Sequence, residues 1–198
     1  MISTNRTCVS HALCYVDGPN IDQVLGRCVL GHRPSSEERP RWDRVHDECL
    51  AWFGAERPCF VLNGNRFTTS SVFGFRRALR SIGFDVQCPR SAADDPVDEA
   101  DDPVDEFVLQ EIQDSLHAVR SGRVPRVILF SHDHGYASAL HDVLQGNGAV
   151  TIVGFREELA PALLALESEG ADVLDLEYDL AAFDIDLGRP YRPGERAA

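Results

Sequence analysis

Two aspartates directly follow short apolar runs, and their placement predicts a shared metal site. Asp17 ends the run that begins at Cys14, and Asp133 follows the apolar run 127–130 after two polar residues. In open parallel sheets, ligands bind just outside the carboxyl ends of the strands. We therefore expect the two side chains at one edge of a sheet, although 116 residues separate them in sequence. Carboxylates suit hard divalent cations, so the pair indicates a metal-dependent phosphoryl-transfer enzyme or a protein derived from one.

Asn20 stands at the same corner as Asp17, after Gly18 and Pro19. Glycine followed by proline predicts a sharp turn after the strand, which would place the Asn20 side chain beside Asp17 as a further oxygen donor. The alternative is a tight turn in which Asp17 and Asn20 only bond backbone amides.

Asp133 has polar neighbours on both sides. Ser131 could orient Asp133 or a bound water, whereas His132 and His134 flank it. Adjacent residues of an extended chain point in opposite directions, so we do not expect His132, Asp133 and His134 to bind one zinc ion. The alternative role for Asp133 or Ser131 is capping of the following helix.

Asp105 is the third candidate, in the first turn of a predicted helix that begins at Pro103. A carboxylate is electrostatically favourable there in any case. Other acids compete for the same role, namely Asp98, Asp101, Asp102 and Glu106.

The elements that must position these residues alternate between strand and helix. Apolar runs predict strands at 11–16, 58–62, 84–88, 127–130, 150–153 and 173–176. Helical spacing of apolar residues predicts helices at 41–53, 71–82, 103–119, 136–144 and 159–167. This alternation is typical of an α/β fold with a mainly parallel sheet of five to six strands, covered on both faces.

One domain is expected over residues 8–187, followed by a polar C-terminal tail at 188–198. Residues 93–106 contain the same seven-residue sequence twice, which indicates a local duplication. The second copy leads into the helix at 103–119, and 93–102 is expected to be an acidic loop that repels a phosphodiester.

The net charge of −13 is unevenly distributed, since residues 1–90 carry +3 and residues 91–198 carry −16. So negative a molecule is unsuited to broad, non-specific nucleic-acid binding. Six cysteines without metal-site spacing predict free thiols in a cytoplasmic protein. No apolar run is long enough to span a membrane, and the polar start is unlike a signal peptide.

Several of these segments together resemble the NYN domain family, a branch of the PIN-like nucleases. Residues 15–20 look like its strand ending in Asp-Gly-x-Asn, and residues 104–105 are similar to its Val-Asp pair at a helix start. Residues 131–136 resemble its Ser-Gly-Asp-Ser-Asp-Phe type of sequence, and 148–154 its glycine-then-strand segment. The resemblance extends over residues 11–155 in the same order.

The resemblance implies a three-layer α/β/α Rossmann-like fold and Mg²⁺- or Mn²⁺-dependent hydrolysis of RNA. By position, Asp17, Asp105 and Asp133 would be the metal ligands and catalytic residues, and Asn20 and Ser131 supporting or substrate-contacting residues. The RNA backbone would be contacted by Arg66, Arg76, Arg77 and Arg80. A solvated helix face is the alternative role for these arginines.

Two positions depart from the family pattern. Gly135 stands where a fourth acid is often found, and His132, at a glycine position, is expected to crowd the site entrance. These departures leave a second hypothesis open, a catalytically weakened RNA- or protein-binding regulatory module of the same fold. A homo-oligomer is compatible with either hypothesis. A phosphatase with Asp17 as nucleophile ranks last, because Pro19 stands where that pattern requires a second aspartate.

Overall fold

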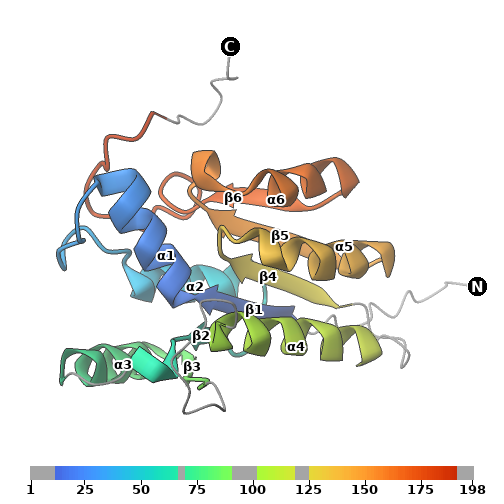
Figure 1. Cartoon of the computed structure of the whole chain (residues 1–198), viewed down its shortest axis with the longest axis horizontal. Helices are drawn as coiled ribbons and strands as arrows, with labels where there is room; N and C mark the ends of the chain where they lie inside the picture. The colour runs from blue at the N-terminus through green and yellow to red at the C-terminus, as the bar shows by residue number, and fades with distance from the viewer. Residues whose placement is uncertain (1–11, 67–69, 91–101, 119–124, 191–198) are drawn as a thin grey trace, which may run out of the picture.

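Strands and helices alternate along the chain, and the strands form one parallel sheet. The computed structural model describes residues 12–66, 70–90, 102–118 and 125–190. The strands are β1 (Ala12–Asp17), β2 (Cys59–Val61), β3 (Asp85–Gln87), β4 (Arg126–Phe130), β5 (Ala149–Gly154) and β6 (Asp172–Asp175). Their order in the sheet is β3-β2-β1-β4-β5-β6, and all neighbouring pairs are parallel (Figure 1). The expected parallel sheet is confirmed.

Helices cover both faces of this sheet, so the fold is a three-layer Rossmann-like arrangement. The main helices are α1 (Gly18–Val24), α2 (Trp42–Ala51), α3 (Ser70–Ile82), α4 (Pro103–Ala118), α5 (Ala137–Gln145) and α6 (Pro161–Ala165). The short ones are η1 (Leu25–Leu30), η2 (Gly64–Arg66), η4 (His134–Tyr136), η5 (Arg156–Glu158) and η6 (Leu166–Glu169). Helices α1, α2 and α3 pack into one buried apolar cluster, and α4, α5 and α6 into a second on the opposite face.

The strand order reverses between β1 and β4, and this reversal fixes where a ligand can bind. From β1 the chain builds outward to β2 and β3, then returns to the other side of β1 for β4. Val16 is paired with Phe130, so Asp17 and Ser131 leave neighbouring strands at the same level. In doubly wound sheets, this point of reversal is where a crevice opens at the carboxyl ends of the strands.

The segment after β1 differs from expectation, because a helix stands where a turn was predicted. Asp17 caps α1, and Pro19 lies in its first turn, where the missing N–H does no harm. The apolar spacing of Ile21, Val24 and Leu25 is helical and was the available signal. Gly18 is required for close approach rather than for an unusual turn: a Cβ there would lie 2.3 Å from the Phe60 ring.

Elsewhere, the predicted elements agree with the structure to within a few residues. Gly83 ends α3 with a positive φ of 126°, as expected of a helix C-terminus. The second copy of the duplication leads into α4. Residues 93–101, and with them most of the expected acidic loop, lie outside the described residues, as do 191–198.

The expected tail boundary at residue 188 leaves out an anchored arginine. Arg189 is 3% exposed and donates two hydrogen bonds to the Asp175 carboxylate, at 2.8 and 2.6 Å. It also pairs with Glu157 and Glu177, and its guanidinium lies 4.8 Å from the centre of the Phe155 ring. Arg189 therefore belongs to the folded domain.

Five cysteines fall within the described residues, and all carry free thiols, as predicted. Cys14 and Cys49 bring β1 and α2 together in the core, with their sulfur atoms 3.4 Å apart. None of the described helices has both the length and the apolar character needed to span a lipid bilayer.

Candidate metal and catalytic site

Asp17 lies at the carboxyl end of β1 with both of its side-chain oxygens in use. The residue is 3% exposed. Its Oδ1 accepts the Asn20 backbone N–H at 3.1 Å, which is the helix-capping contact. Its Oδ2 accepts hydrogen bonds from the hydroxyls of Ser131, at 3.1 Å, and Tyr136, at 3.2 Å. One oxygen of Asp17 therefore bonds a backbone amide, as in the alternative interpretation of a capping role. The second oxygen faces the predicted site.

Tyr136 joins two of the predicted acids through one hydroxyl group. Its Oη lies 2.6 Å from Asp105 Oδ1 as well as 3.2 Å from Asp17 Oδ2. The side chain is fully buried, and burial together with the charges of Asp17 and Asp105 raises its pKa, so the phenol stays protonated. One phenolic proton cannot be donated to two carboxylates at once. The carboxylates of Asp17 and Asp105 therefore share a single donor at Tyr136.

The pKa values of both carboxyl groups are raised, and burial is the largest cause. Burial and, to a smaller extent, the charge of Asp105 together raise the pKa of Asp17 to about 7, against the opposing hydrogen bonds from Asn20, Ser131 and Tyr136. Burial also raises the pKa of Asp105; Asp133 and Asp102 add to this effect, and the Tyr136 hydroxyl opposes it. These acids are coupled through space, so a cation placed among them would favour their ionised forms.

Asp133 completes the group from the carboxyl side of β4. Its backbone N–H donates to Ser131 Oγ at 3.2 Å, so one buried hydroxyl links Asp133 to Asp17. Its Oδ1 accepts the Gly135 N–H at 2.7 Å, which caps η4. Ser131 is fully buried and holds the two acids in place, a positioning role rather than the predicted substrate contact.

Asn20 and His132 bond one another next to Asp17. The Asn20 side-chain oxygen accepts hydrogen bonds from the backbone N–H and from ring Nδ1 of His132, both at 2.9 Å. Ring Nε2 accepts the Phe155 N–H at 2.8 Å, which fixes the neutral tautomer. Burial and, to a smaller extent, the charge of Arg189 together lower the pKa of His132 to about 4. His132 is 5% exposed, so the expectation that it crowds the entrance is wrong.

The two histidines beside Asp133 point apart, as predicted. His132 is turned into the core, where its ring stacks on Phe155 at 5.6 Å, whereas the His134 side chain is 83% exposed. A zinc site made from this run would need both rings on one side.

Sequence reasoning missed Tyr136, the residue that joins the acids. Its only signal was a position three residues after Asp133, at the start of the next helix. Of the competing acids, Asp102 is occupied at the start of α4: it accepts the Val104 N–H at 3.0 Å and the Asn63 amide at 3.3 Å. Asp98 and Asp101 lie outside the described residues.

Three of the predicted RNA-contacting arginines lie on α3, which packs against the edge strand β3. Arg76 is half-buried and Arg77 is exposed, both on α3. The exposed Arg80 donates to the Val86 carbonyl at 3.4 Å. The Arg66 side chain is outside the described part of the chain.

The donor set suits Mg²⁺ or Mn²⁺ by chemistry, although it is not assembled. Within the described ranges, no three His, Cys, Asp or Glu side chains are arranged to hold a metal ion. However, Asp17 and Asp105 both reach one oxygen, Tyr136 Oη, and these hard cations need only one or two carboxylates besides waters and phosphates. Asp133 Oδ1 accepts the Gly135 N–H, and the charge of Asp133 acts on Asp105.

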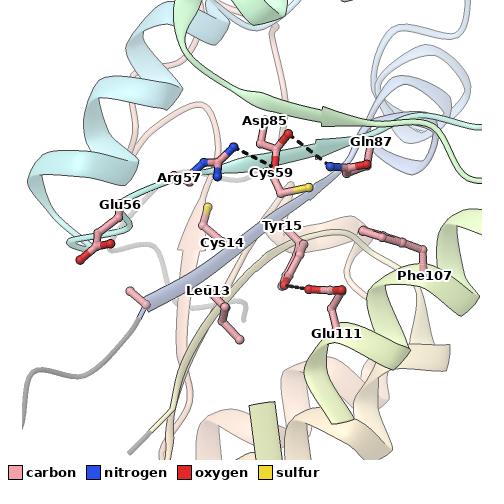
Figure 2. Close-up of a pocket in the computed structure, with 11 residues that line it drawn as sticks. Leu13, Cys14, Tyr15, Glu56, Arg57, Cys59, Asp85, Gln87, Phe107 and Glu111 are labelled. Carbon is pink, nitrogen blue, oxygen red and sulfur yellow. Dashed lines mark hydrogen bonds and ion pairs between the residues drawn. The ribbon is translucent and has the colours of Figure 1, made fainter. Parts of the chain in front are cut away.

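A cavity of about 410 Å³ lies elsewhere, between α4 and the strands β1, β2 and β3 (Figure 2). Its polar side chains bond one another: Tyr15 donates to Glu111 at 2.9 Å, and Gln87 donates to Asp85 at 3.2 Å. Neither Asp17 nor Asp105 lines it. The cavity is therefore distinct from the acid site.

Comparison with family models, with curated proteins and with solved structures finds no match to this chain. The likeness to the NYN family accordingly rests on the motifs alone, and the functional argument rests on the geometry of Asp17, Asp105, Asp133 and Tyr136.

Proposed function

We propose that this protein is a metal-dependent ribonuclease that hydrolyses phosphodiester bonds at the carboxyl ends of β1 and β4. The observation that carries the proposal is the contact of Asp17 and Asp105 with one buried hydroxyl, Tyr136 Oη. These acids come from β1 and α4, far apart in sequence, and burial without a cation raises the pKa of both. Perturbed acids that converge at a sheet switch point are typical of functional sites.

In this proposal Asp17 and Asp105 hold Mg²⁺ or Mn²⁺, with Asp133 as the third ligand. The bound ion would lower the pKa of a water and stabilise negative charge on the scissile phosphate. Tyr136 stays protonated and orients the two carboxylates, and Ser131 fixes Asp17 relative to Asp133. His132 holds Asn20, whose backbone N–H orients Asp17. Without a metal ion Asp17 has a pKa of about 7, so the free site is fully ionised only above neutral pH.

RNA as the substrate is supported by the motif resemblance and by the local charge. Residues 57–90 contain six arginines and one acid in a chain whose net charge is −13. These residues form β2, α3 and β3, next to the acid site in the sheet. A phosphate chain can therefore approach the carboxylates from this side of an otherwise acidic molecule.

The test is cleavage of labelled single-stranded and structured RNA with Mg²⁺ or Mn²⁺. We expect Asp17→Asn and Asp105→Asn to lower the cleavage rate by about 100-fold or more. Asp114→Asn is the matched control, because Asp114 is exposed on the same helix as Asp105. Cleavage that survives a chelator, or that is unchanged in Asp17→Asn, would disprove the mechanism.

A second candidate is a regulatory module that binds RNA or protein without cleaving. Two observations favour it: Gly135 carries no fourth acid, and no three-ligand set is assembled among the described residues. RNA binding without cleavage under either metal would select this candidate.

A further inference from the structure

The cavity of about 410 Å³ beside α4 is large enough to hold a small organic molecule. Its floor is a row of side chains across three strands, because Tyr15 of β1 is paired with Cys59 of β2, and Cys59 with Asp85 of β3. Residues paired in this way point to the same face of a sheet. One wall is α4, where Phe107 and Glu111 are four residues apart and therefore lie on one side of the helix (Figure 2).

This side of α4 differs from the side that carries the candidate metal ligand. Asp105 precedes Glu111 by six residues, which places the two side chains about 120° apart around the helix axis. Tyr136, which contacts Asp105, is not among the described residues that line the cavity. A ligand in the cavity would therefore occupy a place that the proposed nuclease does not use.

Glu111 presents to the cavity a carboxylate without a cation to balance it. Its Oε2 accepts the Tyr15 hydroxyl at 2.9 Å, and no arginine or histidine of the described residues pairs with it. Burial and the hydrogen bond with Glu111 raise the pKa of Tyr15, so this hydroxyl stays protonated and holds the carboxylate in place. A half-buried carboxylate fixed by a neutral donor favours a cationic ligand, since charged hydrogen bonds are the stronger ones.

Two further acids and one arginine line the same cavity. Asp85 and Glu56 lie beside Arg57, whose guanidinium is 3.6 Å from Asp85. The Arg57 side chain is 79% exposed, so its pairing with Asp85 is weak. Burial and the charges of Asp85 and Glu111 together raise the pKa of the Cys59 thiol to about 12, against the opposing charge of Arg57. The floor of the cavity therefore has a negative potential.

The acids stand on different walls, and apolar side chains line the cavity with them. Neighbouring strands are about 4.8 Å apart, so Asp85 on β3 lies about 10 Å across the sheet from Tyr15, the partner of Glu111. Apolar surface comes from Leu13 and Phe107. Within the described residues these acids do not converge as metal ligands must. Separated carboxylates with apolar surface fit several ammonium groups joined by methylene chains better than a compact ion.

We propose that this cavity binds a linear polyamine. One ammonium group bonds to Glu111 and a second to Asp85, where it competes with Arg57. The methylene chain lies against Leu13 and Phe107, and the exposed Glu56 supplies a third carboxylate. The cavity is separate from the acid site, so this proposal does not depend on the nuclease.

The test is isothermal titration calorimetry of the whole chain with spermidine at physiological salt. Glu111→Gln keeps an acceptor for the Tyr15 hydroxyl but removes the charge, and we expect it to weaken binding by about tenfold. Asp85→Asn should weaken binding by about threefold. Arg57→Gln removes the competing cation, so it should tighten binding by about twofold to threefold.

Two controls separate a built site from general attraction to an acidic protein. Asp114→Asn is the matched variant, because Asp114 is exposed on the same helix and does not line the cavity. It should bind spermidine as the wild type does. Cobalt hexaammine has the charge of spermidine without its methylene chain, and it should bind about tenfold more weakly. Thermal melts confirm that each variant is folded.

Failure of the wild type to bind spermidine would overturn the proposal. So would an equal loss of affinity in Asp114→Asn and Glu111→Gln, weaker binding in Arg57→Gln than in the wild type, or equally tight binding of cobalt hexaammine. Loss of spermidine binding in Asp17→Asn would place the polyamine at the acid site instead. The nuclease is tested separately, since RNA cleavage depends on Asp17 and spermidine binding on Glu111.

Discussion

Asp17 is an acid that titrates near neutral pH although it is almost fully buried. Hydrogen bonds from Asn20 and Ser131 and the shared Tyr136 hydroxyl favour its ionised form, yet burial and the charge of Asp105 outweigh them. The pKa of this carboxyl therefore rises to about 7 rather than falling below 3.8. A site built only for stability would not place Asp105 within reach of the same hydroxyl, since the two acids repel each other when ionised.

This arrangement predicts that the metal-free site lowers the free energy of unfolding, by an amount that depends on pH. Between about pH 4 and pH 7 the folded protein holds a proton on Asp17 that the unfolded chain has released, so stability falls as the pH rises through this window. Asp17→Asn removes that loss. We expect the variant to melt about 4 °C above the wild type near pH 8 in chelator, equivalent to about 1–2 kcal/mol, and at the same temperature near pH 4.

Thermal melts across that pH range provide the measurement, and adding Mn²⁺ near pH 8 should raise the melting temperature of the wild type only. Asp114→Asn serves as the control for removal of one acid. A wild type that gains stability over Asp17→Asn as the pH rises would contradict the assignment of the raised pKa.

At the scale of elements, the sequence predicted the strands well and placed the ends of β1 and β4 side by side, because both follow from regular rules. Apolar runs mark buried strands, and parallel strands place their carboxyl ends at one edge. The α1 helix was not predicted, because Gly18 and Pro19 were interpreted as a turn. Tyr136 was not predicted either, because the meeting of its hydroxyl with Asp17 and Asp105 depends on how η4 packs beside α4. Such contacts between elements leave no local pattern.

Two glycines separate the effects of close packing and of helix propensity. A Cβ at Gly18 would collide with the buried Phe60 ring, whereas a Cβ at Gly74, inside α3, would meet no atom within 4 Å. We expect Gly18→Ala to lower the free energy of unfolding by about 1–3 kcal/mol and Gly74→Ala to raise it by up to about 1 kcal/mol. Denaturant unfolding measures both. Equal effects of the two variants would show that packing against β2 does not explain Gly18.

At the scale of the whole molecule, charge is divided between two sides of one sheet. The β2–α3–β3 side is rich in arginine, whereas acids dominate the chain beyond residue 90. On the acidic side, Arg189 pairs with Asp175 and Glu177 in the interior and with the more exposed Glu157. The sequence suggested a polar tail here, because nothing in the order of residues 188–198 shows which arginine is buried.

Replacing Arg189 tests how strongly this buried pairing holds the domain together. Arg189→Met keeps an apolar stem against Phe155 but leaves the three acids without their cation. We expect a loss of about 3–5 kcal/mol in the free energy of unfolding, measured in denaturant. Arg41→Met removes an arginine that pairs with Asp184 at the surface, and it should change stability little. Equal losses in the two variants would contradict a special role for Arg189.

The anchoring of Arg189 also has a consequence for the order of events during synthesis. The ribosome makes Glu157, Asp175 and Glu177 before it makes the arginine that pairs with them. Until that residue has emerged, its ion pairs with the three carboxylates at the end of β5 and β6 cannot form. The acid site between β1 and β4 is complete in sequence well before this point. The residues of the candidate site are therefore synthesised before Arg189, which anchors this corner of the sheet.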